Sequence, residues 1–409
     1  MTYRAPKGTG DILPPASEQW RRLLRFWDEL SERYGYGFIM TPIFESTEVF
    51  ARGVGRSTEV VQKQMYTFQD KAGRSLTMRP EMTASVVRAY LELGLRGVFK
   101  AAYSGPMFRY EQPQAGRKRQ FYQLGVEYLA EAAPQSDVEV IEVGYRFLEG
   151  AGLSDVSVPL NSIGDPVCRP AYRERLVAYL EERRTELDED CQRRIADNPL
   201  RVLDCRVDVP KLSDAPSPVE ALCEPCAEHI EAVQTGLKEL GIPFEPAPRL
   251  VRGLDYYTRT VFEYVSPRYE VAQDSLGGGG RYDGLAEALG GPPTPGVGVS
   301  LGLDRIVLAL GDQAIEPKLD VFVILAESGR RSEAFRLMSR LRSSGLRVDA
   351  DLGQRSVKAQ FRTANRRKAA GAVVVGEEWD EDKVTARDLV TGDQRLIPVE
   401  EVEEWARSR

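Results

Sequence analysis

The stretch from Gly105 to Glu127 constrains this chain more than any other segment. It reads as two strands, at about 98–104 and 121–129, joined by a polar loop at 112–119. Guanidinium groups match phosphate oxygens in geometry and charge, whereas carboxylates bind amines. The segment therefore predicts a sheet face that suits a polyphosphate together with an amine, and ATP plus an amino acid is the obvious ligand pair. The side chains that carry the pattern are Arg109, Arg117, Arg119, Glu111, Gln123 and Glu127.

Length and composition predict a protein of several domains. A chain of 409 residues is expected to form two or three of them. Hydrophobic residues make up 42% and charged residues 29%, and no apolar run approaches the ~18 residues of a membrane helix. The sequence that follows Met1 also lacks the apolar core of a signal peptide. We expect a cytoplasmic protein with no membrane association.

The rare residue types exclude several classes of site. The five cysteines are odd in number and lie between Cys168 and Cys226, which does not suit the disulfide framework of a secreted domain. The single histidine, His229, excludes a multi-histidine metal centre and is the only imidazole that could serve a nucleophile as a base. The net charge of −7 means that an RNA partner would have to meet a local basic surface. Chemistry in this chain must rest on Arg, Glu, Tyr and Gln.

The first part of the chain reads as an α+β domain. Apolar residues at helical spacing predict a helix over Ser17–Arg33, and further helices are expected at 81–95 and 135–150. The apolar stretch 38–45 reads as a strand, and Pro42 within it indicates a sheet edge or a subunit boundary. Strands joined by local connections, with helices between them, predict an antiparallel sheet with flanking helices.

The pattern of hydrophobic residues changes twice in the remaining chain. From about 165 to 246 the pattern becomes helical, with helices expected at 169–187 and 220–240, so we expect an inserted helical domain. After Pro317, buried-type strands alternate with helices, which predicts a separate α/β domain with a largely parallel core. The predicted segments are 1–164 and 247–316 for the two parts of the sheet domain, 165–246 for the insertion and 317–409 for the α/β domain.

Three further blocks accompany the first one in order along the chain. They are Arg79–Thr83 (RPEMT), Val251–Arg259 (VRGLDYYTR) and Ser300–Ile306 (SLGLDRI). Gly105–Glu127 resembles motif 2 of the class II aminoacyl-tRNA synthetases, and the four blocks together resemble the histidyl-tRNA synthetase family. Within that resemblance, Val251–Arg259 looks like the family's histidine motif, Ser300–Ile306 like motif 3 and the strand around Pro42 like motif 1.

The resemblance covers essentially the whole chain, including the opening Lys7–Asp11 and the block Gly278–Leu285. It implies a catalytic domain in two parts, interrupted by the helical insertion, and an anticodon-binding domain at 317–409. The implied activity is ATP-dependent ligation of L-histidine to its tRNA through a histidyl-adenylate, with Mg²⁺ accompanying ATP. The resemblance also implies a homodimer whose interface includes the strand around Pro42.

Carried over residue by residue, the resemblance implies an ATP site built on the first block. Arg109 would contact the α-phosphate, and Arg117 and Arg305 the outer phosphates. Phe121 would stack on adenine and Glu111 would recognise it.

The same resemblance implies a histidine site. Glu81, Thr83 and Gln123 would hold the amino group, while Glu127 and Tyr257 would read the imidazole. Arg252 would lie between the carboxylate and the α-phosphate, so that Arg252 and Arg109 are the residues expected to act in catalysis. The implied histidine-binding set is Glu81, Met82, Thr83, Gln123, Glu127, Arg252, Tyr256 and Tyr257.

For tRNA, the resemblance implies contacts at two places. Gln114 and Arg117 in the loop 112–119 would approach the acceptor stem. A cationic helix within 355–368 of the last domain would contact RNA as well.

Two local features depart from a simple reading of these motifs. Met82 stands where the family commonly has a glycine, and we expect its side chain to point away from the ligand. The glycine block Gly277–Gly280 lacks the lysine and hydroxyl of a nucleotide P-loop, so we expect backbone packing beside the site.

The spacing of Cys223, Cys226 and His229 is that of a metal knuckle, with Cys168, Cys191 or Cys205 as a possible fourth ligand. Cys226 and His229 also fit the apolar stripe of the helix 220–240. The sequence therefore favours structural thiols and predicts no bound metal.

Two alternatives remain open from the sequence. One is a non-catalytic regulatory subunit of histidine biosynthesis built on the same catalytic fold; such chains typically degrade the histidine motif or motif 3, whereas Arg252, Tyr257 and Arg305 are all present here. The other is a class II synthetase of different specificity, such as a prolyl or threonyl enzyme, whose pocket residues usually differ.

Overall fold

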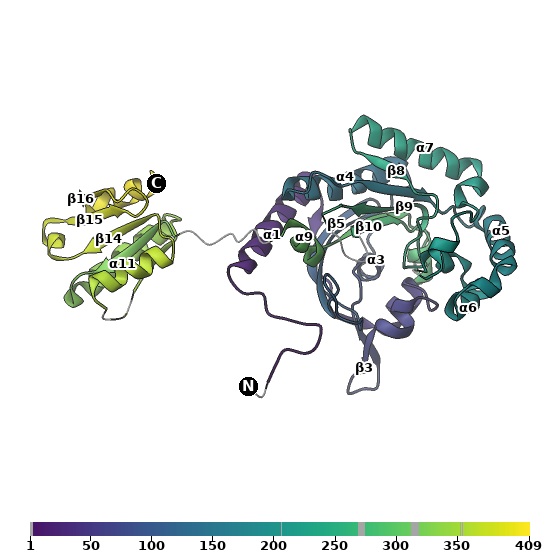
Figure 1. Ribbon diagram of the computed structural model, residues 1–409, viewed down its shortest axis with the longest axis horizontal. Coiled ribbons are helices and arrows are strands. Elements are labelled where there is room, and N and C mark those ends of the chain that lie inside the picture. The colour runs from purple at the N-terminus through teal and green to yellow at the C-terminus, as the bar shows by residue number, and fades with distance from the viewer. Residues whose placement is uncertain (1–2, 206, 269–274, 312–318, 352, 354) are drawn as a thin grey trace. The chain divides into compact units, whose positions relative to one another are not determined.

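The computed structural model describes residues 3–205, 207–268, 275–311, 319–351, 353 and 355–409 (Figure 1). The chain forms two compact units, one built mainly from Gln19–Gln313 and the other mainly from Ala314–Arg409. Each is described by itself. No helix within the described residues combines the length and apolar character needed to cross a bilayer.

The larger unit is organised around a sheet of eight strands in the order β1-β5-β6-β11-β10-β9-β7-β8. Neighbouring strands are antiparallel except at the two edges, where β1 pairs with β5 and β8 with β7 in parallel. The predicted α+β class is confirmed. The strands are β1 (Gly37–Phe38), β5 (Phe99–Phe108), β6 (Gln120–Leu129), β7 (Val158–Ser162), β8 (Phe244–Pro246), β9 (Thr258–Val265), β10 (Ser275–Arg281) and β11 (Gly296–Gly302).

Helices cover one face of this sheet with the main hydrophobic core. Along α1, Leu23, Trp27 and Leu30 recur at helical spacing and are buried against the sheet, where Trp27 Nε1 donates a 3.1 Å hydrogen bond to the carbonyl of Tyr103. Figure 1 shows α4 and α7 lying side by side over the strands. The helices of this layer are α1 (Ala16–Arg33), α4 (Pro134–Ala151), α7 (Glu224–Glu239) and α9 (Leu303–Leu310).

The predicted strand 38–45 is divided between two sheets. Its first residues form β1, whereas Phe44–Ser46 (β2) pairs with β4 (Ser75–Met78) in a separate sheet of order β2-β4-β3. Pro42 lies between the two pieces and has no N–H to donate, so a continuous ladder cannot pass through it. The remaining elements here are β3 (Tyr66–Gln69), α2 (Thr47–Gly53), η1 (Val60–Gln64), α3 (Thr83–Glu92) and α8 (Leu285–Ala288).

The helical region after β7 packs Tyr172, Leu176 and Ile195 into a second hydrophobic core, which it shares with residues of α3, β9 and α8. The strand β8 and the helix α7 fall inside the predicted insertion 165–246, yet β8 pairs with β7 and α7 packs on α4. Both therefore belong to the layers of the main sheet. The elements of the helical region are α5 (Arg169–Glu182), η2 (Arg184–Glu186), α6 (Glu189–Asp197), η3 (Pro199–Asp204), η4 (Val209–Lys211) and η5 (Pro218–Ala221).

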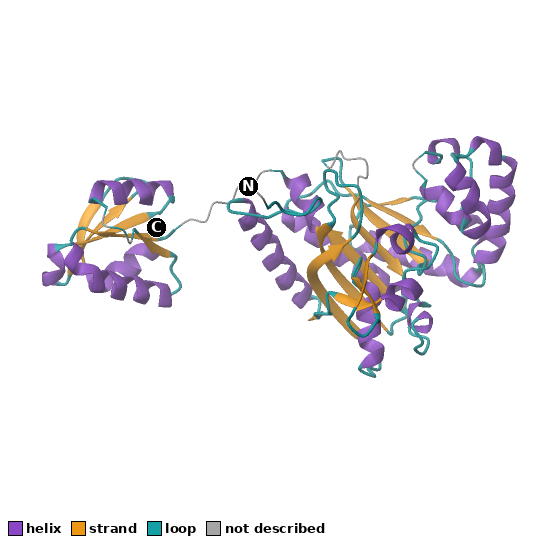
Figure 2. Cartoon of the chain, turned by 90° about the horizontal axis from the view of Figure 1, so that it is seen from below, coloured by secondary structure: helices purple, strands orange, loops and turns teal. Residues whose placement is uncertain are grey.

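The smaller unit is a sheet of order β13-β12-β14-β15-β16 with helices on both faces (Figure 2). Side chains of β12 alternate between the two cores, with Val321 and Val323 on one face and Phe322 and Ile324 on the other. The first three strands are parallel, as predicted, but the sequence pattern missed the antiparallel hairpin of β15 and β16. The elements are β12 (Val321–Leu325), η6 (Ser328–Arg330), α10 (Arg331–Ser343), β13 (Val348–Ala350), α11 (Val357–Arg366), β14 (Gly371–Val375), η7 (Glu377–Glu381), β15 (Lys383–Asp388), β16 (Gln394–Pro398), η8 (Val399–Glu401) and α12 (Val402–Arg407).

A fully buried ion pair joins β10 to the first turn of α4. The guanidinium of Arg281 contacts the carboxylate of Asp137, and it also donates to Ser136 Oγ (2.8 Å), the Glu131 carbonyl (3.0 Å) and an Asp283 oxygen (3.1 Å). Neither charged side chain of the pair is exposed to solvent. Because both charged groups have lost their hydration, each one is stabilised by the opposite charge of the other.

We predict that Arg281→Met destabilises the larger unit by about 3–5 kcal/mol, because it leaves the Asp137 carboxylate buried without its cation. Urea denaturation followed by circular dichroism measures the loss. The control is Arg74→Met, which removes an exposed ion pair with Asp70 and should cost no more than about 1 kcal/mol. Equal small losses in both variants would contradict the role given to the network.

Candidate active site

A cavity of about 880 Å³ opens on the face of the sheet opposite the α1–α4 layer. Strand alternation decides which residues line it. On β6, Leu124 and Val126 point into the main core, so that Phe121, Gln123 and Glu127 share the opposite face. The two-residue period of the strand thus places Phe121 and Gln123 in the cavity lining, and Glu127 on the same face beneath residues that line it.

Glycines on the neighbouring strands form the floor. Gly298 on β11 lies opposite Glu127, and Gly125 on β6 lies between Tyr103 on β5 and Ser300 on β11. A Cβ at Gly298 would collide with Oε2 of Glu127, and one at Gly125 would collide with the ring of Tyr103. Both positions therefore require glycine, because any larger residue would take the space that the side chains of Glu127 and Tyr103 occupy.

Glu127 is fully buried beneath the cavity and receives three hydroxyl hydrogen bonds. Thr83 Oγ1 donates to Oε1 at 2.6 Å, Tyr103 donates to the same oxygen at 3.3 Å, and Tyr282 donates to Oε2. Burial raises the pKa of Glu127 to about 8; the hydrogen bonds from Thr83 and Tyr282 act against this rise. The strands thus hold a carboxyl group in a dry environment, where it keeps its proton at neutral pH.

The residues expected to hold an amino group surround this carboxylate. Glu81 accepts the backbone N–H groups of Thr83 (2.7 Å) and Ala84 (3.0 Å), which fixes its carboxylate at the N-terminus of α3. The pKa of Glu81 is raised, because the effect of burial outweighs these two backbone hydrogen bonds, which act to lower it. Gln123 also lines the cavity, and its Oε1 is buried without a hydrogen-bond partner among the described residues.

Met82 begins α3 and borders the cavity, but its side chain is buried. It packs with Val86, Tyr103 and Met107, and its sulfur accepts a hydrogen bond from Thr41 Oγ1 at 3.0 Å. The expected orientation away from the cavity agrees with this packing.

Arg252 lies at the β9 side of the cavity and forms an ion pair with Glu263. Burial alone would lower the pKa of Arg252, but the Glu263 carboxylate raises it above its usual range overall. The rings of Tyr256 and Tyr257 also line the cavity, with centroids 4.6 Å apart. Arg252 is therefore held as a cation beside two aromatic hydroxyls.

The other arginines line the same cavity. Arg109 is anchored by its Nε to the Pro80 carbonyl at 2.9 Å, and its guanidinium carbon lies 5.2 Å from the centroid of the Phe121 ring. Arg305 donates to the Ser275 carbonyl at 2.8 Å. The cavity thus concentrates positive charge at one place.

The polar loop between β5 and β6 folds back over this region. Arg117 lies 3.5 Å from a carboxylate oxygen of Glu111, and both line the cavity. Gln114 pairs with Arg117 through two backbone hydrogen bonds, but its own side chain is exposed and is not part of the lining. The loop consequently has an inner edge at the cavity and an outer edge in solvent.

Sequence reasoning missed several polar residues of this site, including four that hold others in place. Glu263 pairs with Arg252, Tyr103 and Tyr282 donate to Glu127, and Asp304 holds the Tyr122 amide at 2.9 Å. Tyr282 and Asp304 stand inside motif blocks and could have been found there. Tyr103 and Glu263 carry no local signal, since only strand register brings them to the cavity.

His229 takes no part in the cysteine knuckle suggested by its spacing. Its Nε2 lies 3.3 Å from Oδ1 of Asp137, so it joins α7 to α4 beside Arg281. The thiols of Cys223 and Cys226 instead lie near Cys168 and Asp165.

Comparison with known proteins identifies the family to which this site belongs. The sequence model described as histidyl-tRNA synthetase matches residues 8–306, and the model described as anticodon binding domain matches residues 320–409. The chain belongs to the histidyl-tRNA synthetase family. The resemblance seen in the sequence motifs is thereby confirmed.

Relatives match along their full length. Histidine–tRNA ligases are 47% identical in Pelotomaculum thermopropionicum and 48% identical in Moorella thermoacetica, each covering 100% of this chain and 98% of the relative. The solved structure of apo histidyl-tRNA synthetase from S. aureus has a TM-score of 0.83 at 37% identity, with 99% of this chain and 100% of that chain covered. The histidyl-tRNA synthetase of Nostoc sp., at 21% identity and a TM-score of 0.74, shares the fold.

The buried carboxylate of this family member predicts a pH-dependent stability. Its folded pKa is raised from 4.5 to about 8, so between these values the folded chain holds a proton that the unfolded chain releases. Raising the pH through this window therefore lowers the free energy of unfolding. Glu127→Gln lacks the titrating group and does not show this loss. The thermal midpoint of the variant minus that of wild type should therefore rise from pH 4.5 to about 8.

Thermal unfolding across that window measures the effect. Ser300→Ala serves as the control because it changes a neighbouring cavity residue that does not titrate, and its difference from wild type should stay constant with pH. A constant difference for Glu127→Gln as well would contradict the raised pKa.

Proposed function

We propose that this chain is a histidine–tRNA ligase. It activates L-histidine with ATP to histidyl-adenylate and pyrophosphate, and then transfers the histidyl group to the 3′ end of histidine tRNA. The observation that carries the proposal is a buried carboxyl group, Glu127, beneath a cavity whose lining includes six arginines. Such a cavity suits a substrate with a polar ring and a partner with a triphosphate. The arginines are Arg109, Arg117, Arg201, Arg249, Arg252 and Arg305.

The activation step brings two anions together. A carboxylate oxygen of histidine attacks the α-phosphorus, a new P–O bond forms, and the bond to the bridging oxygen breaks so that pyrophosphate leaves with its electron pair. The nucleophile is already ionised, so the site has to neutralise charge and needs no general base. Arg109 and Arg252 are proposed to do this at the α-phosphate.

Selection of histidine rests on the hydrogen bonds at the floor. An imidazole can exchange hydrogen bonds with the Glu127 carboxyl group and the hydroxyls around it, whereas an apolar side chain cannot. Tyr256 and Tyr257 would complete the ring pocket, and Glu81, Thr83 and Gln123 would hold the amino group. Met82 would contribute through its backbone position at the start of α3.

The nucleotide is proposed to occupy the arginine end. Arg117 and Arg305 would meet the outer phosphates, and Phe121 would stack on adenine with Glu111 at its edge. Mg²⁺ would enter with ATP. Carboxylate oxygens of the kind that Mg²⁺ prefers line the cavity on Glu111 and Glu263.

Transfer RNA would meet the chain at two surfaces. The outer edge of the loop 112–119, with Gln114 exposed and Arg117 behind it, would approach the acceptor stem. In the smaller unit, α11 presents Lys358, Arg362 and Arg366 to solvent, which suits phosphate contacts. We propose that 1–164 and 247–316 form the catalytic domain, 165–246 a helical insertion and 317–409 the anticodon-binding domain.

The assembly is proposed to be a cytoplasmic homodimer. Large apolar side chains are exposed on both sides of Pro42, among them Phe38, Met40 and Phe44. The Phe44 ring packs edge-on against Phe68, which is exposed as well. A contiguous apolar patch of this kind favours burial against a second copy.

A regulatory subunit of histidine biosynthesis is the weaker alternative. A structure from Bacillus halodurans named as an ATP phosphoribosyltransferase regulatory subunit/histidyl-tRNA synthetase shares the fold, at a TM-score of 0.66 and 24% identity. The chain keeps Arg252, Tyr257 and Arg305 at the cavity, which a protein without catalytic function would not need.

The proposed activity is tested by ATP–pyrophosphate exchange with each proteinogenic amino acid in turn. We expect exchange with histidine alone, because the carboxyl and hydroxyl groups at the floor of the cavity match an imidazole ring. Exchange with another amino acid would overturn the specificity, and no exchange with any of them would favour the regulatory alternative.

Arg252 provides the sharpest test of the site. We predict that Arg252→Ala slows histidine-dependent exchange by ~10² to 10³, the usual cost of removing one preorganised charge contact. Arg252→Lys should lose less, since it keeps the charge but not the planar fork that bridges two anions. ATP binding should survive in both variants because Arg109, Arg117 and Arg305 remain at the cavity.

Exchange kinetics and nucleotide binding by calorimetry measure the two effects separately. The matched control is Arg119→Ala, which removes an arginine that stacks on Tyr110 and does not line the cavity. Near-normal exchange in a folded Arg252→Ala protein would remove Arg252 from the reaction.

A further inference from the structure

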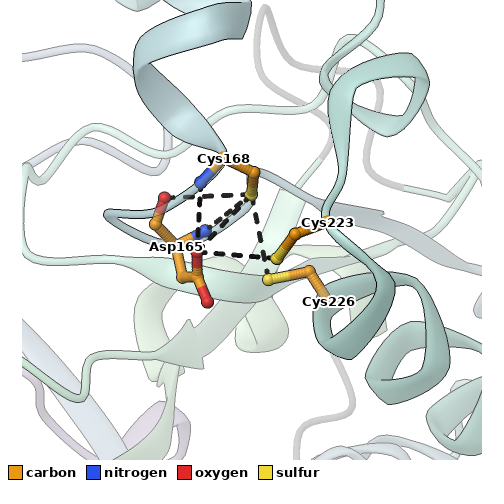
Figure 3. A group of neighbouring side chains, drawn as sticks. All are labelled: Asp165, Cys168, Cys223 and Cys226. Atoms are coloured by element: carbon orange, nitrogen blue, oxygen red, sulfur yellow. Dashed lines mark hydrogen bonds between the residues drawn. The ribbon is translucent and has the colours of Figure 1, made fainter.

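Three thiols and one carboxylate converge where the helical region leaves the main sheet and returns to it (Figure 3). Asp165 and Cys168 precede α5, and Cys223 and Cys226 belong to the first turn of α7. Their four ligand atoms all lie within 4.8 Å of one another. Cys168 and Cys226 are buried, while Asp165 and Cys223 are half-buried.

The distances match a tetrahedral metal site. Zinc bonds of ~2.3 Å to sulfur and ~2.0 Å to oxygen place two thiolates ~3.8 Å apart and a thiolate ~3.5 Å from a carboxylate oxygen. Here Cys168 Sγ lies 3.9 Å from Cys226 Sγ and 3.5 Å from Asp165 Oδ1, and Cys223 Sγ lies 3.9 Å from the same oxygen. A disulfide would need the sulfurs at ~2.05 Å, so the three cysteines are separate thiols.

The surrounding backbone supports the same arrangement. The amide of Asp165 donates to Cys168 Sγ at 3.3 Å, and the amides of Val167 and Cys168 donate to Asp165 Oδ1 at 3.0 and 3.3 Å. Arg259 donates to the second oxygen of Asp165 at 3.3 Å. Bonds of this kind orient metal ligands and stabilise their anionic forms.

The turn that carries these ligands also requires a glycine. Gly164 has φ +70°, and a Cβ there would lie 2.6 Å from Cys168 Sγ. A larger residue would displace the thiol from the cluster.

We propose that Asp165, Cys168, Cys223 and Cys226 bind one structural Zn²⁺. Soft thiolates favour zinc over hard cations, and four protein ligands leave no open position for catalysis. This reverses the sequence prediction of no bound metal: Cys168 is one of the fourth ligands considered there, and Asp165 takes the place of His229.

A second cysteine group does not offer the same set. Cys191, Cys205 and Asp208 lie close together, but they supply three donors among the described residues. Cys205 is therefore a suitable control position.

The metal would join the segment before α5 to the start of α7, beside the active site. Arg169, the residue after Cys168, donates to the carbonyl of Tyr257 at 2.5 Å, and the backbone of Arg259 pairs with that of Ile163 and Gly164. Zinc would close the loop that runs from Cys168 to Cys223 at the point where it touches the histidine motif.

The test is the metal content of the full chain purified under reducing conditions without chelator. We expect about one zinc per chain, and below about 0.1 in Cys168→Ser, Cys223→Ser and Cys226→Ser, while Cys205→Ser keeps it. Removal of the metal from wild type by a strong chelator should lower the thermal midpoint, and added Zn²⁺ should restore it.

Cobalt substitution tests the site in wild-type protein, whatever the folding of the variants. Apo-protein titrated with Co²⁺ should show the visible bands of a tetrahedral complex and thiolate charge-transfer absorption, saturating at about one Co²⁺ per chain. Wild type that takes up neither Zn²⁺ nor Co²⁺, an octahedral cobalt spectrum, or loss of zinc from Cys205→Ser alone would overturn the proposal.

Discussion

The active site depends on one constraint: the carboxylate of Glu127 is buried on a strand whose neighbours must leave it room. The glycines of the floor provide that room, and the hydroxyls of Thr83, Tyr103 and Tyr282 supply the hydrogen bonds that a desolvated carboxylate needs. The large empty volume above the sheet follows from the same glycines. A sheet with ordinary side chains on this face would fill its own cavity.

Charge in the cavity is arranged before any ligand arrives. Arg252 is held by Glu263, Arg117 lies beside Glu111, and Arg109 is fixed by a backbone carbonyl. Arginines oriented in this way lose little freedom when they meet phosphate, which is the advantage of a preorganised electrostatic site. The carboxylates that orient them also limit the repulsion between the clustered guanidinium groups.

Buried polar contacts also decide how the layers hold together outside the cavity. Arg281 and His229 both meet Asp137, so β10, α4 and α7 converge on one carboxylate. Burial would raise the pKa of Asp137, yet hydrogen bonds and charges from His229 and Arg281 lower it overall. At the N-terminus of α7, the first turn brings Cys223 and Cys226 to the loop before α5, next to the strand that begins at the end of the histidine motif.

The sequence by itself determined the family, the α+β class and the four motif blocks, because these rest on local spacing and on residue types that match ligand chemistry. It also placed Phe121, Gln123 and Glu127 on one strand face, since the period of two is a local property. Tertiary structure alone decided the partners of these residues: Glu263 for Arg252, Tyr103 for Glu127, and Asp137 for His229. Strand register and helix packing join positions that are far apart in the chain, and no local pattern records which distant residues will meet.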